Sequence, residues 1–229
     1  MSEVDRLSVT LVMALLNGEP HLGDCLAAID AQTQPPHQVV VVDGGSTDGS
    51  RQRVGAWPKG TVLDIPNAGW HAALNAAITI ATGDLVAIIS SDDLLDPRAL
   101  ERHAAALAAA PEAGYSYGRV ALFADAGGVS DSVPDGLDGT TPSARVLEAL
   151  AIRRTVLDQV GGFAPEIRHS ADVEWVARLG DRGIVPAVID EVVVAKRLHT
   201  GNTTYTQAAV ADGITQSLRM SILRKQGRA

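Results

Sequence analysis

The chain has 229 residues, and 46% of them are hydrophobic. That content is sufficient for a buried core and excludes a disordered chain, which is poor in aliphatic residues. The formal net charge of −8 argues against broad binding to nucleic acid, which requires clustered positive charge. A single cysteine, Cys25, excludes an internal disulfide and a thiolate metal cluster.

No apolar run approaches the roughly 20 residues of a membrane span. The acidic residues 1–5 lack the basic segment leading into an apolar one that marks a signal peptide. We see no internal repeat and no linker. We therefore expect a cytoplasmic protein with a single domain over residues 1–229, a length within the range of large single domains.

The first part of the chain alternates short apolar runs with segments of helical spacing. Strands are predicted over 7–15, 39–42, 61–65 and 85–89, and helices over 21–31, 70–81 and 97–110. The last of these helices is predicted to have Asp96 as its N-cap and Pro97 in its first position. Parallel strands need long, right-handed crossovers. The order therefore predicts an α/β fold with an open, mostly parallel twisted sheet and helices on both faces.

The second part is less regular. Strands are predicted over 117–123 and 192–197, helices over 154–160, 171–182 and 205–225, and a loop rich in Gly, Asp, Ser and Pro over 125–142. These elements complete the same domain.

Polar residues follow three of the four strands of the first part: Asn17, Asp43 and the cluster Ser90–Asp93. Ligands of open α/β sheets bind outside the carboxyl ends of the strands. The sequence therefore predicts a binding site at this edge. The alternative is that polar residues simply end strands where the loops meet water.

Asp92 and Asp93 follow an apolar strand directly. Two adjacent carboxylates suit a hard divalent cation such as Mg²⁺ or Mn²⁺, which also binds substrate phosphates. A solvated turn or a helix cap is the structural alternative.

The glycine-rich segment 44–50 does not match three other motifs. Ser50 stands where a phosphate-binding P-loop needs lysine, and Asp48 stands where a nucleophile elbow needs glycine. The dinucleotide fingerprint is absent after the first strand. The segment instead predicts a turn that caps a following helix.

The second part offers Asp172 and Glu174, which do not share a helix face because they are two positions apart. One of them is expected to face a cleft and the other water, or Asp172 caps the helix. His199 follows a strand and is either a metal ligand or a hydrogen-bonded structural histidine.

Taken in their order along the chain, the segments with these polar and glycine-rich motifs resemble those of family 2 glycosyltransferases, which have the GT-A fold. Residues 40–50 are close to the second-strand signature of the family, with a double glycine like that of one bacterial polysaccharide branch. Residues 67–84 resemble its middle segment, and Ile89-Ser90-Ser91-Asp92-Asp93 occupies the place of its metal-binding Asp-x-Asp. Gly161-Gly162-Phe163 with Ala171-Asp172 is similar to the segment that carries the catalytic base.

The resemblance implies transfer of a sugar, with inversion, from a UDP-, GDP- or dTDP-sugar donor to a glycan or lipid-linked acceptor, with Mn²⁺ or Mg²⁺ as cofactor. It implies Asp172 as general base, Asp92 as metal ligand and His199 as a further metal ligand. Asp43 would accept a hydrogen bond from the base of the nucleotide. The implied residues of the nucleotide-sugar site are Asn17, Asp43, Asn67, Gly69, Asn75, Ser90, Ser91 and Asp92. Residues 1–96 would form the donor half, and residues 97–229 the acceptor half with its C-terminal helix.

The chain departs from the family pattern at Ser90, which replaces the first aspartate of Asp-x-Asp, and at Ala171, which replaces a frequent glutamate. A nucleotidyltransferase that makes sugar nucleotides and a degenerate transferase without turnover are the alternatives. Basic residues near the C-terminus predict at most peripheral contact with the inner face of a membrane, because each contributes only ~1 kcal/mol.

Overall fold

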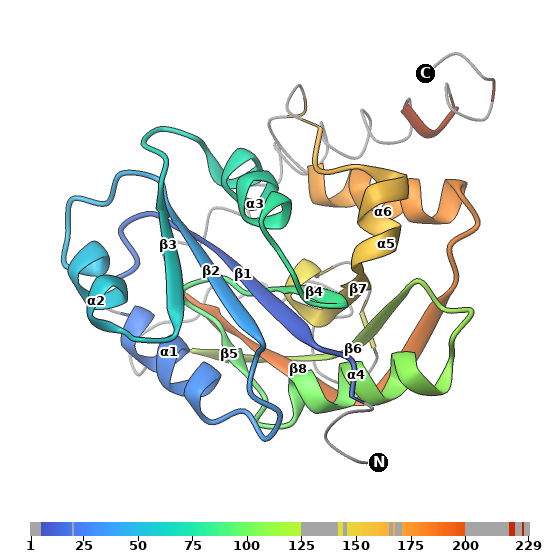
Figure 1. Cartoon of the computed structure of the whole chain (residues 1–229), viewed down its shortest axis with the longest axis horizontal. Coiled ribbons are helices and arrows are strands. Elements are labelled where there is room, and N and C mark those ends of the chain that lie inside the picture. Colours follow the sequence, from blue (N-terminus) through green and yellow to red (C-terminus); the bar gives the residue numbers. More distant parts are fainter. Residues whose placement is uncertain are drawn as a thin grey trace.

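The computed structural model describes residues 6–19, 21–124, 142–143, 146–164, 167, 171–199, 220–222 and 226. The N-terminal part contains β1 (Val9–Leu15), α1 (Leu22–Asp30), β2 (Gln38–Asp43), α2 (Ser50–Ala56), β3 (Gly60–Asp64), α3 (Trp70–Thr79) and β4 (Leu85–Ile88). The C-terminal part contains β5 (Leu94–Leu95), α4 (Ala99–Ala109), β6 (Tyr115–Ala124), the 3-10 turn η2 (Leu147–Ala149), β7 (Leu150–Arg153), α5 (Arg154–Val160), α6 (Ala171–Asp181) and β8 (Pro186–Leu198). Figure 1 shows their arrangement.

The strands form one sheet in the order β3-β2-β1-β4-β7-β6-β8-β5. β1, β2, β3 and β4 pair in parallel, and Val12 of β1 lies opposite both Val40 and Ile88. This part confirms the predicted parallel strands with helical crossovers. Beyond β4 the sheet is mixed, because β7 runs antiparallel to β4 and β6, β8 runs parallel to β6, and β5 runs antiparallel to β8.

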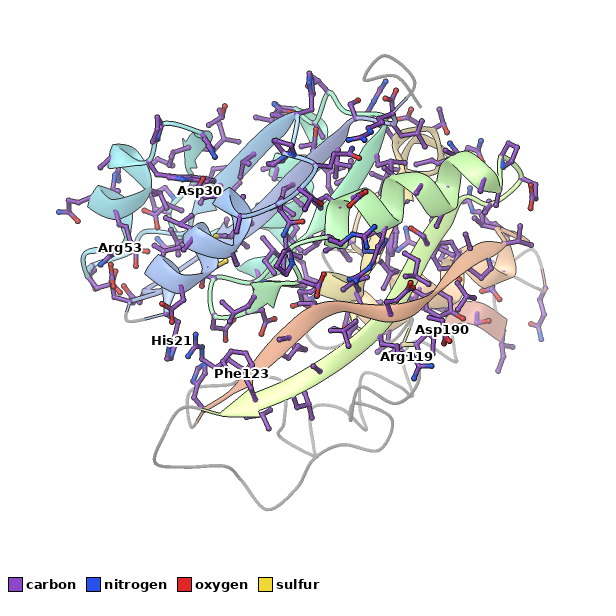
Figure 2. The ribbon with its side chains drawn as sticks, turned by 90° about the horizontal axis from the view of Figure 1, so that it is seen from below. His21, Asp30, Arg53, Arg119, Phe123 and Asp190 are labelled. Carbon is purple, nitrogen blue, oxygen red and sulfur yellow. The ribbon has the colours of Figure 1, made fainter. Side chains whose placement is uncertain are left out.

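Helices cover both faces of the sheet. Every residue of β1 and β4 is buried, and so is β2 from Val39 onward. Continuous burial in place of alternation requires packing on both sides of a strand. α3 packs against β1 and β2, and α4 packs against β6 and β8. The two helices lie on opposite sides of the sheet (Figures 1 and 2), as the sequence predicted.

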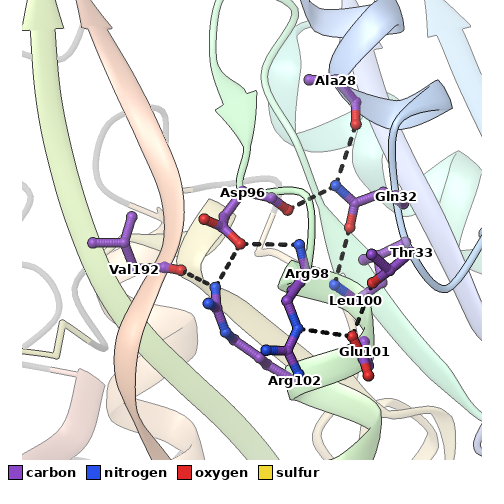
Figure 3. Close-up of polar contacts among 9 residues, drawn as sticks. All are labelled: Ala28, Gln32, Thr33, Asp96, Arg98, Leu100, Glu101, Arg102 and Val192. Carbon is purple, nitrogen blue, oxygen red and sulfur yellow. Dashed lines mark hydrogen bonds and ion pairs between the residues drawn. The ribbon is translucent and has the colours of Figure 1, made fainter.

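A polar cluster fixes the turn from β5 into α4 (Figure 3). Asp96 Oδ1 accepts hydrogen bonds from the Arg98 amide at 2.9 Å and from Arg102 Nη1 at 2.5 Å. Arg102 Nη1 also donates to Val192 O at 2.7 Å, and Gln32 Nε2 donates to Asp96 O at 2.8 Å. The predicted N-cap role of Asp96 is wrong: its carboxylate closes a turn on the amide two residues later, and α4 begins just after that turn.

Two strands of the C-terminal part were not predicted. β7 runs directly into α5 without a turn residue, and a short apolar run of this kind cannot be told from a helix by its periodicity. β5 has only two residues. β8 starts six residues before the predicted strand over 192–197, because its first residues pair with the start of β6. The predicted loop over 125–142 and helix over 205–225 lie almost wholly outside the described residues.

Candidate active site

The loops after β1 and β2 are joined by hydrogen bonds. The Asn17 amide donates to Ser46 Oγ at 2.9 Å, and Asn17 Oδ1 accepts from the Thr47 amide at 2.8 Å. Asp43 Oδ1 accepts from the amide and the hydroxyl of Ser46, at 3.1 and 2.5 Å. Asn17 has a φ of 51°, a left-handed conformation that asparagine adopts more readily than most residues. The structure thus brings Asn17 and Asp43 together at the carboxyl edge of the sheet.

Asp43 carries an unsatisfied acceptor. Its side chain is fully buried, and within the described part of the chain Oδ2 has no hydrogen-bond partner. Leaving a buried polar atom unpaired costs about 1–3 kcal/mol. Because Oδ1 already bonds to Ser46, Oδ2 is the oxygen left without a partner, and the predicted contact of Asp43 with the base of the nucleotide stays a prediction.

The chain turns sharply between β3 and α3. Asn67 and Gly69 have positive φ values of 61° and 71°, and the Asn67 amide donates to Gly44 O at 2.9 Å. A Cβ at position 69 would meet no atom within 4 Å, so the backbone conformation, not the space, favours glycine there. This turn places both predicted binding residues beside the loop that follows Asp43.

Asn75 connects α3 to the segment that precedes α6. Its Nδ2 donates to Phe163 O at 2.9 Å, and its Oδ1 accepts from the Phe163 amide at 2.8 Å. Gly162 has no room for a side chain, because a Cβ there would lie 2.3 Å from Asn75 Oδ1. The Asn75 amide therefore positions the two halves against each other. Its predicted contact with the nucleotide sugar stays a prediction.

Ser90 and Ser91 follow β4 and face different neighbours. Ser90 Oγ donates to Glu148 Oε1 at 2.5 Å. Ser91 lies against Gly18, where an added Cβ would come within 3.0 Å of Ser91 Oγ. Ser90 thus contacts the turn η2, and Ser91 contacts the loop after β1.

Asp92 and His199 lie together although 107 residues separate them in the chain. Asp92 Oδ2 is 3.0 Å from His199 Nε2. The His199 ring in turn faces the ring of His21, with 4.8 Å between centroids. Figure 2 shows His21 at the same end of the molecule as Phe123 of β6. The predicted pair of metal ligands is therefore assembled from the ends of β4 and β8.

A buried cluster of charges lies next to this pair. Lys196 Nζ is 2.6 Å from Asp93 Oδ2 and 3.2 Å from Glu148 Oε1, and the Arg197 amide donates to Asp93 Oδ1 at 3.0 Å. Burial raises the pKa of Asp93 to about 7, although Lys196 opposes the shift. Burial alone would also raise the pKa of Glu148, but Lys196 and the Ser90 hydroxyl outweigh it and lower that pKa. The two carboxylates raise the pKa of Lys196 despite its burial.

Asp172 lies in the first turn of α6 and is partly buried. Burial is the main cause that raises its pKa; the carboxylate of Glu148 adds to this effect, and the Lys196 ammonium opposes it. Asp172 is therefore within electrostatic reach of the charges that contact Ser90.

Glu174 does not face water, in contrast to the expectation that one of the two α6 carboxylates would. It is 1% exposed and forms an ion pair with Arg178. Arg178 Nη1 also donates to the Val160 and Gly162 carbonyls, both at 2.9 Å, and Trp175 Nε1 donates to the carbonyl of the intervening glycine at 2.8 Å. These bonds fix α6, and hence Asp172, on the turn that Asn75 holds from the other side.

An open groove of about 670 Å³ lies between α1 and α2 and includes Leu26, Ala27, Trp57 and Pro58. None of the predicted site residues lines it. The groove nevertheless reaches the loops after β1 and β2, because Glu19 and Gly49 line it.

A family model described as Glycosyl transferase family 2 matches residues 10–164, which is more than half of the chain. The chain belongs to this family. The sequence resemblance is confirmed, and the donor-half motifs and the Asn75-linked glycine turn all lie inside the matched region.

Curated relatives of this family 2 chain share its sequence over part of their length. Glycosyltransferase AglE of Haloferax volcanii is 25% identical over 189 residues, which are 76% of this chain and 62% of AglE. The uncharacterized glycosyltransferase YibD of Escherichia coli is 30% identical over 105 residues, which are 44% of this chain and 30% of YibD. The chain thus spans less than two thirds of either relative.

Solved glycosyltransferases share the fold. S. aureus TarS 1–349 in complex with UDP-GlcNAc has a TM-score of 0.76 at 19% identity, covering 95% of this chain and 67% of that one. The mannosyltransferase PcManGT from Pyrobaculum calidifontis, in complex with GDP-Man and Mn²⁺, has a TM-score of 0.71 at 24% identity, covering 95% of this chain and 64% of that one. These likenesses confirm the predicted GT-A type of α/β fold.

The residues at the predicted metal position fit a divalent cation. The carboxylate of Asp92 and the imidazole of His199 are both ligands that Mn²⁺ accepts, and Mg²⁺ favours carboxylate and phosphate oxygens together with water. In the described ranges no group of three or more His, Cys, Asp or Glu side chains is arranged to hold a metal. Asp92 and His199 would therefore share a cation with non-protein ligands such as phosphates.

Sequence reasoning missed Glu148 and Lys196. Glu148 is a single charge within the apolar run Val146–Ile152, and Lys196 comes directly after the apolar run Val192–Ala195 and before Arg197. Charged residues are almost never fully buried unless they are paired. Two opposite charges in buried runs were the signal for a pair, but only the topology shows which partner each one meets.

Proposed function

We propose that the chain transfers a sugar, with inversion, from a nucleotide-diphosphate sugar to a hydroxyl of a glycan or lipid-linked acceptor. The observation that carries this proposal is the match to family 2 glycosyltransferases over residues 10–164, in a chain whose Asn17 and Asp43 meet at Ser46 on the carboxyl edge of the sheet. The unsatisfied Oδ2 of Asp43 and the contact between Asp92 and His199 support it. TarS was solved with UDP-GlcNAc and PcManGT with GDP-Man, so UDP- and GDP-sugars are the first donors to test.

Asp172 would act as the general base. The attacking hydroxyl must lose its proton as its oxygen bonds to the anomeric carbon, and a carboxylate within ~3 Å can accept that proton. Burial raises the pKa of Asp172, which makes its carboxylate a stronger base. Attack on the face opposite the leaving diphosphate inverts the anomeric centre. A divalent cation bound between Asp92 and His199 would supply positive charge that stabilises the leaving diphosphate.

We also propose a role in glycan or polysaccharide synthesis in the cytoplasm, with at most peripheral contact to the membrane. The names of the glycosyltransferase relatives support the class of reaction on which this proposal rests. Among the helices of the described ranges, none has the length and apolar character needed to cross a bilayer.

The test is turnover of UDP-GlcNAc and of GDP-mannose with Mn²⁺, Mg²⁺ or chelator, measured as release of UDP or GDP. Transfer to water suffices to detect the reaction, and proton NMR of the released sugar reports the anomer that forms first. We expect cation-dependent release and an inverted anomer. Release of pyrophosphate from a sugar phosphate and a nucleoside triphosphate, without nucleotide-sugar turnover, would instead identify a nucleotidyltransferase. Nucleotide binding without any turnover would identify a degenerate transferase.

A further inference from the structure

Trp70 is an exposed aromatic side chain at the joint between the N-terminal and C-terminal parts, and the proposed mechanism does not use it. Among the exposed large hydrophobic residues of the described ranges it is the only aromatic one, at 37% exposure, whereas Trp57 and Trp175 are 9% and 1% exposed. We propose that Trp70 is a stacking platform for a sugar ring of the acceptor. The inference deepens the proposed transfer reaction and rests on it, because that reaction is what makes the bound sugar an acceptor.

Trp70 begins α3 directly after the sharp turn at Asn67 and Gly69. The first turn of a helix favours proline and acidic residues, so helix formation alone gives no reason for a tryptophan at this position. The turn is tied to the loop after β2, because the Asn67 amide donates to Gly44 O at 2.9 Å. Trp70 therefore lies at the carboxyl edge of the sheet, directly beside the predicted donor site.

The Trp70 ring belongs to a series of ring contacts that ends on α6. Its centroid lies 6.1 Å from that of Phe163 and 5.0 Å from that of His71, whose ring is nearly perpendicular to it at 84°. The Phe163 ring lies in turn 5.6 Å from the ring of Trp175. Tilted and edge-to-face pairs at these distances are favourable aromatic contacts. The indole of Trp70 thus joins the start of α3 to the acceptor side of the molecule.

Phe163 is a rigid support for Trp70. It is 2% exposed, and both its amide and its carbonyl bond to the Asn75 side chain, at 2.8 and 2.9 Å. Gly162, next to it, has no room for a side chain. A tryptophan has only two side-chain torsions, so an indole held in this way can bind a ligand at low cost in conformational entropy.

A sugar ring is the occupant that fits an exposed indole at this place. One face of a pyranose ring consists mainly of C–H groups, which are apolar and slightly positive, and the face of an aromatic ring is negative. Trp175 follows Asp172 by three residues, and residues at this spacing are neighbours on a helix. The series of ring contacts therefore ends on the face of α6 that carries the proposed base, which is the side from which the acceptor hydroxyl would attack.

The test uses ¹⁹F NMR of the full chain labelled with 5-fluorotryptophan. The chain contains three tryptophans, and the resonance of Trp70 is identified from its loss in Trp70→Phe. Titration with N-acetylglucosamine, methyl α-mannoside or chitobiose should shift this resonance to saturation for at least one sugar. The resonances of Trp57, which lines the groove between α1 and α2, and of the buried Trp175 should stay in place and thereby exclude a general effect of the sugar.

Variants measure how much the indole contributes to binding. With the sugar that shifts Trp70, Trp70→Ala should raise Kd about tenfold, the loss expected for an aromatic contact of ~1.4 kcal/mol. Trp70→Phe keeps an aromatic ring and should raise Kd by less. Ile80→Ala is the matched control, because Ile80 is 36% exposed and lies at the opposite end of α3. Its Kd should equal that of the parent chain.

The same titrations distinguish an acceptor sugar from the donor. The sugar should bind equally well with saturating UDP and Mn²⁺, because acceptor and donor occupy different places. Competition with UDP, or a shift of Trp70 by UDP or GDP but by none of the sugars, would overturn the inference, since Trp70 would then contact the donor.

A Trp70 resonance that no sugar moves, or equal Kd values for the parent chain and Trp70→Ala, would also overturn it. If the parent chain turns over neither UDP-GlcNAc nor GDP-mannose, the proposed transfer reaction fails, whereas the NMR titrations still decide whether Trp70 binds a sugar ring. Turnover without a sugar contact at Trp70 would leave the transfer reaction intact and remove the platform.

Discussion

Ser90 Oγ lies 2.5 Å from Glu148 Oε1, a contact that spans 58 residues of sequence and joins the end of β4 to the turn before β7. Position 90 is where the family resemblance implies an aspartate. An aspartate there would put a second carboxylate against Glu148 in a buried site, and the two charges would repel. Serine is therefore matched to Glu148, because its hydroxyl can donate to the carboxylate.

We expect Asp172→Asn to bind a nucleotide sugar as the parent chain does and to lose turnover by about 10²–10⁴-fold, the usual contribution of general base catalysis. Asparagine has nearly the same shape but cannot accept the proton of the attacking hydroxyl. Isothermal titration with UDP and a UDP- or GDP-release assay measure the two quantities separately. Unchanged turnover would remove Asp172 from the role of base.

The pH dependence of kcat/KM should show an acid limb above the range of an ordinary aspartate. The base must be deprotonated to act, and burial, with a contribution from Glu148, raises the pKa of Asp172 above that of an ordinary aspartate. Activity is therefore lost as pH falls through this raised pKa and is retained above it. Rates measured over a pH series with saturating Mn²⁺ test this expectation, and an acid limb at or below pH ~4 would contradict it.

Asp92→Ala and His199→Ala should each weaken the cation-dependent part of nucleotide binding. Each removes one of the two side chains that meet at 3.0 Å, and the remaining ligand would then share the cation with fewer protein atoms. The measurement is UDP affinity with Mn²⁺ and with chelator. The expected result is a large effect of chelator on the parent chain and a much smaller one on either variant; a parent chain indifferent to chelator would contradict the site.

Asn75→Ala should destabilise the fold by roughly 1–3 kcal/mol, because the Phe163 amide and carbonyl lose their partners at a buried position. The free energy of unfolding in urea measures this loss. Gln52→Ala on the exposed side of α2 is the control and should leave that free energy within about 0.5 kcal/mol. Equal stability of the two variants would show that the contact between Asn75 and Phe163 contributes nothing.

The parallel half of the sheet could be predicted because its sequence is locally unambiguous. The four valines 39–42 and the run 85–89 are continuous apolar segments between turn residues, and such segments form strands that are covered on both faces. The mixed half could not be predicted in the same way. Leu150–Arg153 has no break before α5, and its place between β4 and β6 depends on pairing with residues far along the chain.

The position of Asp43 and Asp92 at the carboxyl edge of the sheet could be predicted, because each follows an apolar strand, whereas their roles in binding stay predictions. Glu148 and Lys196 could not be predicted as part of the buried cluster of charges, because neither belongs to a motif. Only the folded structure brings them into contact with Ser90 and with each other. For Glu174 only part of the prediction is confirmed. Its spacing from Asp172 correctly placed the two side chains on different faces of α6, but Glu174 contacts Arg178 and not water.

Lys196, which neutralises Asp93, follows it by 103 residues. During synthesis the ribosome releases the parallel strands long before β8, and distant pairings of this kind form late. A nascent chain can therefore bury its valine-rich strands before Lys196 has been synthesised. Until then the carboxyl group of Asp93 stays hydrated and unpaired with Lys196. An incompletely translated polypeptide would then form the parallel strands without the charge cluster that holds Ser90.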